Sequence, residues 1–163
     1  MLEADCGDVL PLLPDASFDL IYIDPPFNTG SPRRLRRLAV TRNERGERVG
    51  FGEQRYTARA LGEMAYADRF DDYLDFLAPK LVRARELLRD EGTLYVHLDY
   101  REAHYVKVAL DGIFGRDCFL NEIVWAYDYG ARTKRRWPAK HDTIFVYVRD
   151  PDRYYFDQDS VER

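Results

Sequence analysis

The chain has 163 residues, 45% of them apolar and 14% aromatic, which excludes a disordered protein and suffices for one domain with a hydrophobic core. Its net charge of −4 does not by itself favour a nucleic-acid partner. No apolar run reaches the roughly 18 residues of a membrane-spanning helix, and no signal-peptide pattern follows Met1, so we expect a cytoplasmic protein without a membrane partner. Cys6, Cys118 and the three histidines lack metal-ligand spacing, which predicts reduced thiols and no metal site.

The first half of the chain predicts a strand and a helix separated by a long insertion. A short helix or turn is expected at residues 8–13, and the β-rich run at 18–24 predicts a buried strand. Residues 31–60 lack clean periodicity, so we expect a long, mobile insertion. Apolar residues at three- and four-residue spacing over 73–88 predict an amphipathic helix, which Pro79 should kink or divide.

The second half continues this alternation. Asp90-Glu91-Gly92 should end the helix, and TLYVHLD at 93–99 predicts a second buried strand, parallel to the first through a right-handed crossover. Residues 102–114 predict another helix that ends at Gly115. Two further strands are predicted at 122–127 and 143–148, around a basic loop at about 128–142. This order favours a single α/β domain over residues 1–163.

An unusual tetrapeptide, Asp24-Pro25-Pro26-Phe27, follows the first predicted strand. Proline cannot donate to a sheet ladder, so the strand must end there, and Asp24 should lie at the carboxyl edge of the sheet, where open α/β sheets bind ligands. The carboxylate and the carbonyls that flank the prolines can accept hydrogen bonds from one NH₂ group, and Phe27 offers a flat face. These features indicate a site for a planar aromatic amine, of which a nucleobase is the obvious example.

The tetrapeptide resembles the catalytic motif of the DNA amino-methyltransferases, in which a first-position aspartate is typical of enzymes that act on adenine N6. Further segments occur in the order seen in the β-class, restriction-modification-like members: Tyr66-Ala67-Asp68, Gly92 to Asp99, Ile113-Phe114-Gly115 and Asn121 to Trp125. The resemblance covers residues 5–150. It implies a Rossmann-like α/β fold, S-adenosyl-L-methionine as cofactor, and site-specific methylation of adenine N6 in double-stranded DNA by a catalytic motif of Asp24, Pro25, Pro26 and Phe27.

The resemblance extends only in part to cofactor binding. It implies that Asp8 contacts the cofactor together with Asp24, although an aspartate there could equally cap a helix. The family's glycine-rich cofactor loop, Phe-x-Gly-x-Gly, has no counterpart in the chain. We therefore expect an incomplete, amino-terminal part of the methyltransferase fold, which forms a homodimer or is completed by a second half. The alternatives are a non-catalytic DNA-binding remnant and an amino-methyltransferase that acts on RNA or protein.

Basic residues cluster in two segments. Residues 31–59 contain nine arginines and three glutamates, and Arg33 and Arg34 directly follow the tetrapeptide segment. The second cluster surrounds Trp137 and comprises Arg132, Lys134, Arg135, Arg136 and Lys140. Because phosphate binding depends on local charge, we expect both clusters to contact DNA, with a solvated surface as the alternative. His97, on the second predicted strand, is expected to be a packed core residue.

Overall fold

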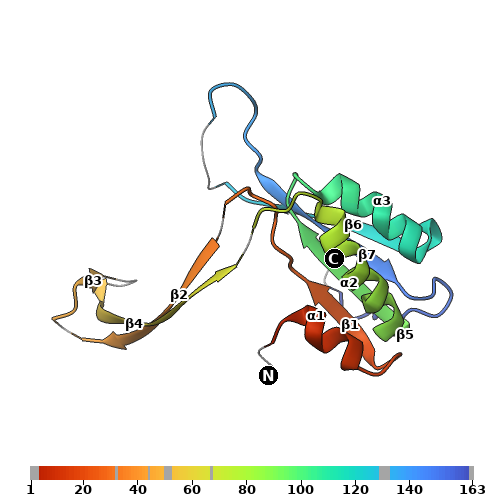
Figure 1. Cartoon of the computed structure of the whole chain (residues 1–163), viewed down its shortest axis with the longest axis horizontal. Helices are drawn as coiled ribbons and strands as arrows, with labels where there is room; N and C mark the ends of the chain where they lie inside the picture. Colours follow the sequence, from red (N-terminus) through yellow and green to blue (C-terminus); the bar gives the residue numbers. More distant parts are fainter. Residues whose placement is uncertain are drawn as a thin grey trace. The chain divides into compact units, whose positions relative to one another are not determined.

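The computed structural model describes residues 4–31, 33–43, 45–49, 53–66, 68–128 and 133–161, with the side chains at 33–38 and 60–66 left undescribed. The chain forms two compact units. The larger unit comprises Met1–Asn28 with Phe70–Arg163, and the smaller unit comprises Thr29–Arg69. Each unit contains its own sheet (Figure 1).

The larger unit contains a four-stranded mixed sheet. Its strand order is β1 (Phe18–Ile23), β5 (Leu88–Leu98), β7 (His141–Val148) and β6 (Phe119–Ala126). β1 and β5 are parallel, whereas β7 runs antiparallel to both of its neighbours. The predicted parallel pair and the predicted strand pair around the basic loop are therefore confirmed.

Two helices pack against this sheet and against each other: α2 (Tyr73–Leu87) and α3 (Ala103–Phe114). Alternate residues of a strand point to the same face, and the core is formed by such residues of β5 and β7 together with the apolar stripes of both helices. Its most buried members include Leu77, Leu81, Leu94, Val96, Leu98, Val106, Leu110 and Tyr147. Gly115, with a φ of 93°, ends α3 as predicted.

Two details of the predicted elements were wrong. β1 is a strand but is not buried, because it lies at the edge of the sheet; the side chains of Leu20 and Tyr22 are half exposed. α2 passes into β5 without a loop, so Asp90-Glu91-Gly92 lies within the strand instead of ending the helix. Pro79 lies inside α2 and does not divide it, and the kink that was the other expectation stays a prediction.

The predicted turn at residues 8–13 consists of a short helix, α1 (Cys6–Val9), followed by a 3-10 turn, η1 (Leu10–Leu12). Asp5 caps α1, since its Oδ1 accepts a hydrogen bond from the Gly7 amide at 2.7 Å. Asp8 lies one turn further, exposed to solvent. The capping role that Asp8 could have had therefore belongs to Asp5.

The smaller unit is an antiparallel ribbon, so the expectation of an insertion without regular structure was wrong. β2 (Arg33–Arg42) pairs with β4 (Arg55–Tyr66), and β3 (Arg48–Val49) adds to β4. A register shift after Arg37 interrupts the alternation that a sequence pattern would show. At the base of the ribbon, buried Asp68 accepts hydrogen bonds from the Thr29 hydroxyl and, at its carbonyl, from the Gly30 amide at 2.8 Å.

Candidate active site

The tetrapeptide lies at the carboxyl edge of the four-stranded sheet. Asp24 follows β1, and β5 ends beside it because the two strands are parallel. β7 is antiparallel to β5, so its first residues, His141 and Asp142, meet the same edge. The Asp24 side chain is 60% exposed, so its carboxylate is open to solvent at this edge.

The immediate neighbours of Asp24 are a histidine and a tyrosine. His97 Nδ1 lies 3.8 Å from Asp24 Oδ1 and 3.2 Å from the Tyr22 hydroxyl. Partial burial raises the pKa of Tyr22, and the negative charge of Asp24 raises it further. Tyr22 therefore keeps its proton at neutral pH and remains a hydrogen-bond donor.

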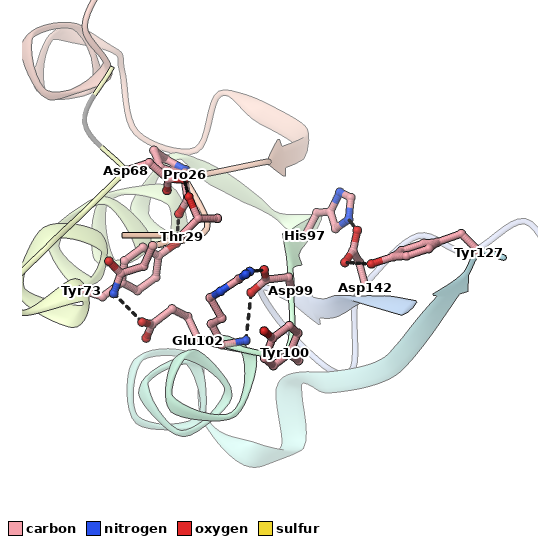
Figure 2. A network of polar contacts seen from close by, with 12 residues as sticks. Pro26, Thr29, Asp68, Tyr73, His97, Asp99, Tyr100, Glu102, Tyr127 and Asp142 are labelled. Carbon is pink, nitrogen blue, oxygen red and sulfur yellow. Dashed lines mark hydrogen bonds and ion pairs between the residues drawn. The ribbon is translucent and has the colours of Figure 1, made fainter. Parts of the chain in front are cut away.

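The proline turn is braced by side chains from distant elements. The Tyr73 hydroxyl, at the start of α2, donates to the Pro26 carbonyl at 2.7 Å (Figure 2). Asn28, in the left-handed region with a φ of 54°, donates to Glu102 Oε1 at 2.7 Å and accepts from the Phe70 amide at 3.0 Å. A carbonyl oxygen has two acceptor positions, and among the described residues Tyr73 is the one that donates to Pro26. The turn is thus fixed independently of any ligand.

An aromatic cluster lies beside the turn. The Phe27 and His97 rings meet edge to face at 5.6 Å, and the His97 and Trp125 rings are parallel within 4° at 5.9 Å. His97 Nε2 lies 3.4 Å from Asp142 Oδ2, and the Tyr127 hydroxyl donates to Asp142 Oδ1 at 3.1 Å (Figure 2). The sequence led us to expect a packed core residue at position 97. The His97 ring is packed, but it also contacts polar groups and lies beside Asp24. Its position near the end of the strand next to Asp24 was the sequence signal for this placement.

The turn after β5 links this edge to the basic loop. Asp99 is buried, accepts from the Arg101 amide at 2.9 Å and pairs with the Arg101 guanidinium; burial nevertheless raises the pKa of Asp99. The Arg136 guanidinium lies over the Tyr100 ring at 5.5 Å and donates to its hydroxyl at 3.1 Å. Arg136 thereby ties the basic loop to the turn after β5.

The structure describes the other predicted DNA-binding residues in part. Lys134 and Arg135 are exposed, and Trp137 is 94% exposed. Lys140 donates to the Asp128 carbonyl at 2.8 Å and so helps to close the loop. Arg132 and the side chains of Arg33 and Arg34 lie outside the described part of the chain.

A pocket of about 390 Å³ adjoins the tetrapeptide. It is lined by Cys6, Leu10, Ile21, Tyr22, Ile23, Asp24, Pro25, Pro26, Phe76, Leu77, Lys80 and Ala84. The walls are mostly apolar, with charged groups at Asp24 and Lys80; Asp8 is not among the lining residues. Within the described residues, no cluster of side chains has the composition of a metal site, and no helix is long and apolar enough to cross a membrane.

Comparisons with known proteins agree with this geometry. Residues 18–163 match the sequence model of a family described as DNA methylase. The type III restriction-modification enzyme EcoP15I Mod subunit of Escherichia coli is 27% identical over 82% of this chain and 21% of its own length. The type II methyltransferase M.EcaI of Enterobacter cloacae is 32% identical over 76% of this chain and 21% of its own.

A solved structure shows the same fold. The M1.HpyAVI–SAM complex superposes with a TM-score of 0.51 at 15% identity, over 99% of this chain and 60% of the other. The chain spans about a fifth of the length of the two sequence relatives, as their covered fractions of 21% show. Since the family match extends from β1 to the last residue, the chain belongs to the DNA methylase family.

Proposed function

We propose that the chain is the target-base half of a site-specific DNA methyltransferase that uses S-adenosyl-L-methionine to methylate adenine N6. One observation carries the proposal: the Asp24 carboxylate is exposed at the sheet edge beside the Phe27 ring, in a turn that Tyr73 and Glu102 hold in place. Aspartate in the first position of the tetrapeptide favours adenine over cytosine.

The chemistry of this site follows from its groups. A base inside a duplex is inaccessible, so the target adenine must leave the stack at a cost of a few kcal/mol, and stacking on Phe27 returns about 1–3 kcal/mol. Asp24 accepts a hydrogen bond from N6 and orients its lone pair. The cofactor, when bound, would supply the methyl group from its sulfonium and leave as the neutral thioether. The amine nitrogen would become positive as it takes the methyl group, Asp24 would stabilise that charge by about 1.5–3 kcal/mol, and the nitrogen would then release one hydrogen to solvent as a proton.

The residues of the pocket fit only part of the cofactor. Leu10, Ile21, Ile23 and Phe76 form apolar walls suited to an adenine ring, and the carboxylate of Asp24 complements a sulfonium. Among the lining residues that the structure describes there is no second carboxylate for the ribose hydroxyls. We propose that Asp24, and Asp8 from the neighbouring α1, contribute to cofactor binding, and that the remaining contacts come from a segment with the glycine-rich loop.

The edge of β1 indicates where such a segment would bind. β1 has no partner strand on its outer side in the described structure, and its two faces carry apolar side chains, among them Leu20 and Ile21. A strand with apolar residues on both faces is typical of the interior of a parallel sheet. An unpaired edge of this kind offers a row of hydrogen-bonding groups to another strand. We therefore propose that a complementing half or a second copy covers β1.

Two basic surfaces would hold the DNA. The loop that carries Lys134, Arg135 and Arg136 lies at the same edge of the sheet as Asp24, and exposed Trp137 offers a ring for stacking. In the ribbon, Arg42, Arg48 and Arg59 are exposed. A two-stranded ribbon is narrow enough to enter the major groove, which suits this unit, including Arg33 and Arg34, to DNA contact. Arg132 belongs to the same basic cluster in the sequence, and we propose that it contacts DNA as well.

Genome-wide mapping of methylated bases tests the proposal with the protein in its own cell. We expect N6-methyladenine at one recognition sequence, and we expect it to disappear when the Asp24 codon is changed to alanine. A silent change of the same codon is the control. The proposal would be overturned if the Asp24→Ala change removed N4-methylcytosine instead of N6-methyladenine. It would also be overturned if the map of methylated bases stayed the same after this change.

A further inference from the structure

The ring of His97 lies at the meeting point of four elements. His97 is the last but one residue of β5, next to the end of β1. It contacts Tyr22 of β1, Phe27 of the catalytic turn, Trp125 of β6 and Asp142 of β7. Its side chain is 15% exposed, against 60% for Asp24, so the ring forms a wall beside the reacting carboxylate.

We propose that His97 is a positioning residue for methyl transfer, which holds the Phe27 ring and keeps the Asp24 carboxylate available to the amine of the target base. This inference rests on the proposed function, because it concerns the same site.

We assign the hydrogen of the His97 ring to Nε2. The Tyr22 hydroxyl lies 3.2 Å from Nδ1 and can donate to it, and Nε2 can then donate to Asp142 Oδ2 at 3.4 Å. The other oxygen of Asp142 accepts from Tyr127 at 3.1 Å. The hydrogen bonds of Tyr22, His97 and Tyr127 thus all run toward the Asp142 carboxylate.

This tautomer has a consequence for Asp24. His97 Nδ1 lies 3.8 Å from Asp24 Oδ1 and, without a hydrogen, does not donate to it. The acceptor positions of Asp24 on that side therefore stay open for the N6 amine. The other neutral tautomer, with a hydrogen on Nδ1, would direct a donor toward the same oxygen and compete with the substrate for it.

The aromatic contacts have a second consequence. Trp125 lies parallel to the His97 ring, and Phe27 meets that ring edge to face, so Phe27 is held through His97 by the sheet. Reacting groups held close to their productive geometry contribute most to rate when their supporting contacts are rigid. A packing role alone would be preserved by phenylalanine at position 97, whereas the proposed role requires the ring nitrogens as well.

Four variants separate these roles in the methyltransferase that carries this chain, assayed with tritiated S-adenosyl-L-methionine and unmethylated double-stranded DNA. His97→Phe keeps the ring and loses the polar chain, so kcat should fall about tenfold with the KM for DNA unchanged. His97→Gln keeps a donor toward Asp142 and loses the ring, so the KM for DNA should rise. Asp142→Ala should lower kcat as His97→Phe does, and the double variant should fall no further. His104→Gln, at an exposed position of α3, is the matched control and should change neither constant.

Nitrogen-15 NMR of the histidines reads the tautomer without activity, with the His97 signals identified by their loss in His97→Gln. We expect hydrogen on Nε2, and Asp142→Ala should weaken that preference. Hydrogen on Nδ1, or His97→Phe with wild-type kcat and KM, would overturn the inference while leaving the proposed function intact. Losses of kcat that follow only the melting temperature would overturn it too. A wild-type protein that transfers no label to DNA would instead remove the proposed function, and this inference with it.

Discussion

Replacement of Asp24 by alanine should abolish most methyl transfer and leave the fold unchanged. The side chain is 60% exposed, and Nδ1 of the neighbouring His97 is 3.8 Å away, beyond hydrogen-bond distance. The free energy of unfolding should therefore change by less than about 0.5 kcal/mol. The variant lacks the hydrogen bond from Asp24 to the nitrogen on which positive charge develops. Its transition state is therefore less stable by about 1.5–3 kcal/mol, which lowers the rate about 10- to 150-fold. A poorly oriented amine lowers it further.

Single-turnover transfer of a tritiated methyl group to DNA measures the rate, and thermal unfolding followed by circular dichroism measures stability. Asp19→Ala is the matched control, since Asp19 is an exposed aspartate of β1, the strand that Asp24 follows; it pairs with Arg89 at 2.7 Å, and its replacement should leave the rate unchanged. A rate within threefold of wild type for Asp24→Ala, a threshold of about 0.6 kcal/mol, would refute the mechanism. A large fall in melting temperature would show that Asp24 supports the fold.

Neutralising Arg132, Arg135 and Arg136 together should reduce the dependence of DNA affinity on salt by about 0.9 log units for each DNA phosphate that the variant no longer binds, and an unchanged slope would assign these residues to structure. Tyr147→Phe should lower the free energy of unfolding in urea by about 1.5–3 kcal/mol, because the buried hydroxyl donates to Asp111 Oδ1 at 2.6 Å. The hydrogen bonds from Lys107 and Tyr147 lower the pKa of Asp111. Their contribution to stability is therefore fully present above the pKa of this carboxyl in the unfolded chain and is lost as the pH falls through its pKa in the folded protein. A stability difference between Tyr147→Phe and wild type that stays constant over this acid range would contradict the assignment. Calorimetric titration of the 163-residue chain with S-adenosyl-L-methionine should show weak binding or none, and one-to-one micromolar binding by a monodisperse chain would place the whole cofactor site within it.

The elements governed by local rules were predictable from the sequence. Pro25 and Pro26 end β1 wherever the strand lies in the sheet, because neither can donate to a ladder. The apolar stripes of α2 and α3 have helical spacing, and both helices were found within one residue of their predicted limits. Parallel pairing of β1 with β5 followed from the helix between them.

Features that depend on neighbours were not predictable in the same way. The apolar residues of β1 predicted burial, but exposure of Leu20 depends on which strands flank β1. The ribbon was missed because its strands combine arginine, threonine and alanine without strict alternation, and cross-strand pairing specifies it instead. His97 was assigned to the core since position along a strand does not reveal which side chains surround the strand's end.

The tetrapeptide is short, yet its geometry depends on residues far from it in the sequence. Tyr73 and Glu102 brace the turn across separations of 47 and 74 residues, and both belong to the larger unit. His97 and Asp142, in the same unit, form the wall beside Asp24. The contacts that would orient a target base are therefore made by one compact body, whereas the pocket beside Asp24 has groups for only part of the cofactor. Under the proposed function Asp24 serves both the base and the cofactor, and a partner bound along β1 would supply the remaining cofactor contacts without rearranging the turn that Tyr73 and Glu102 brace.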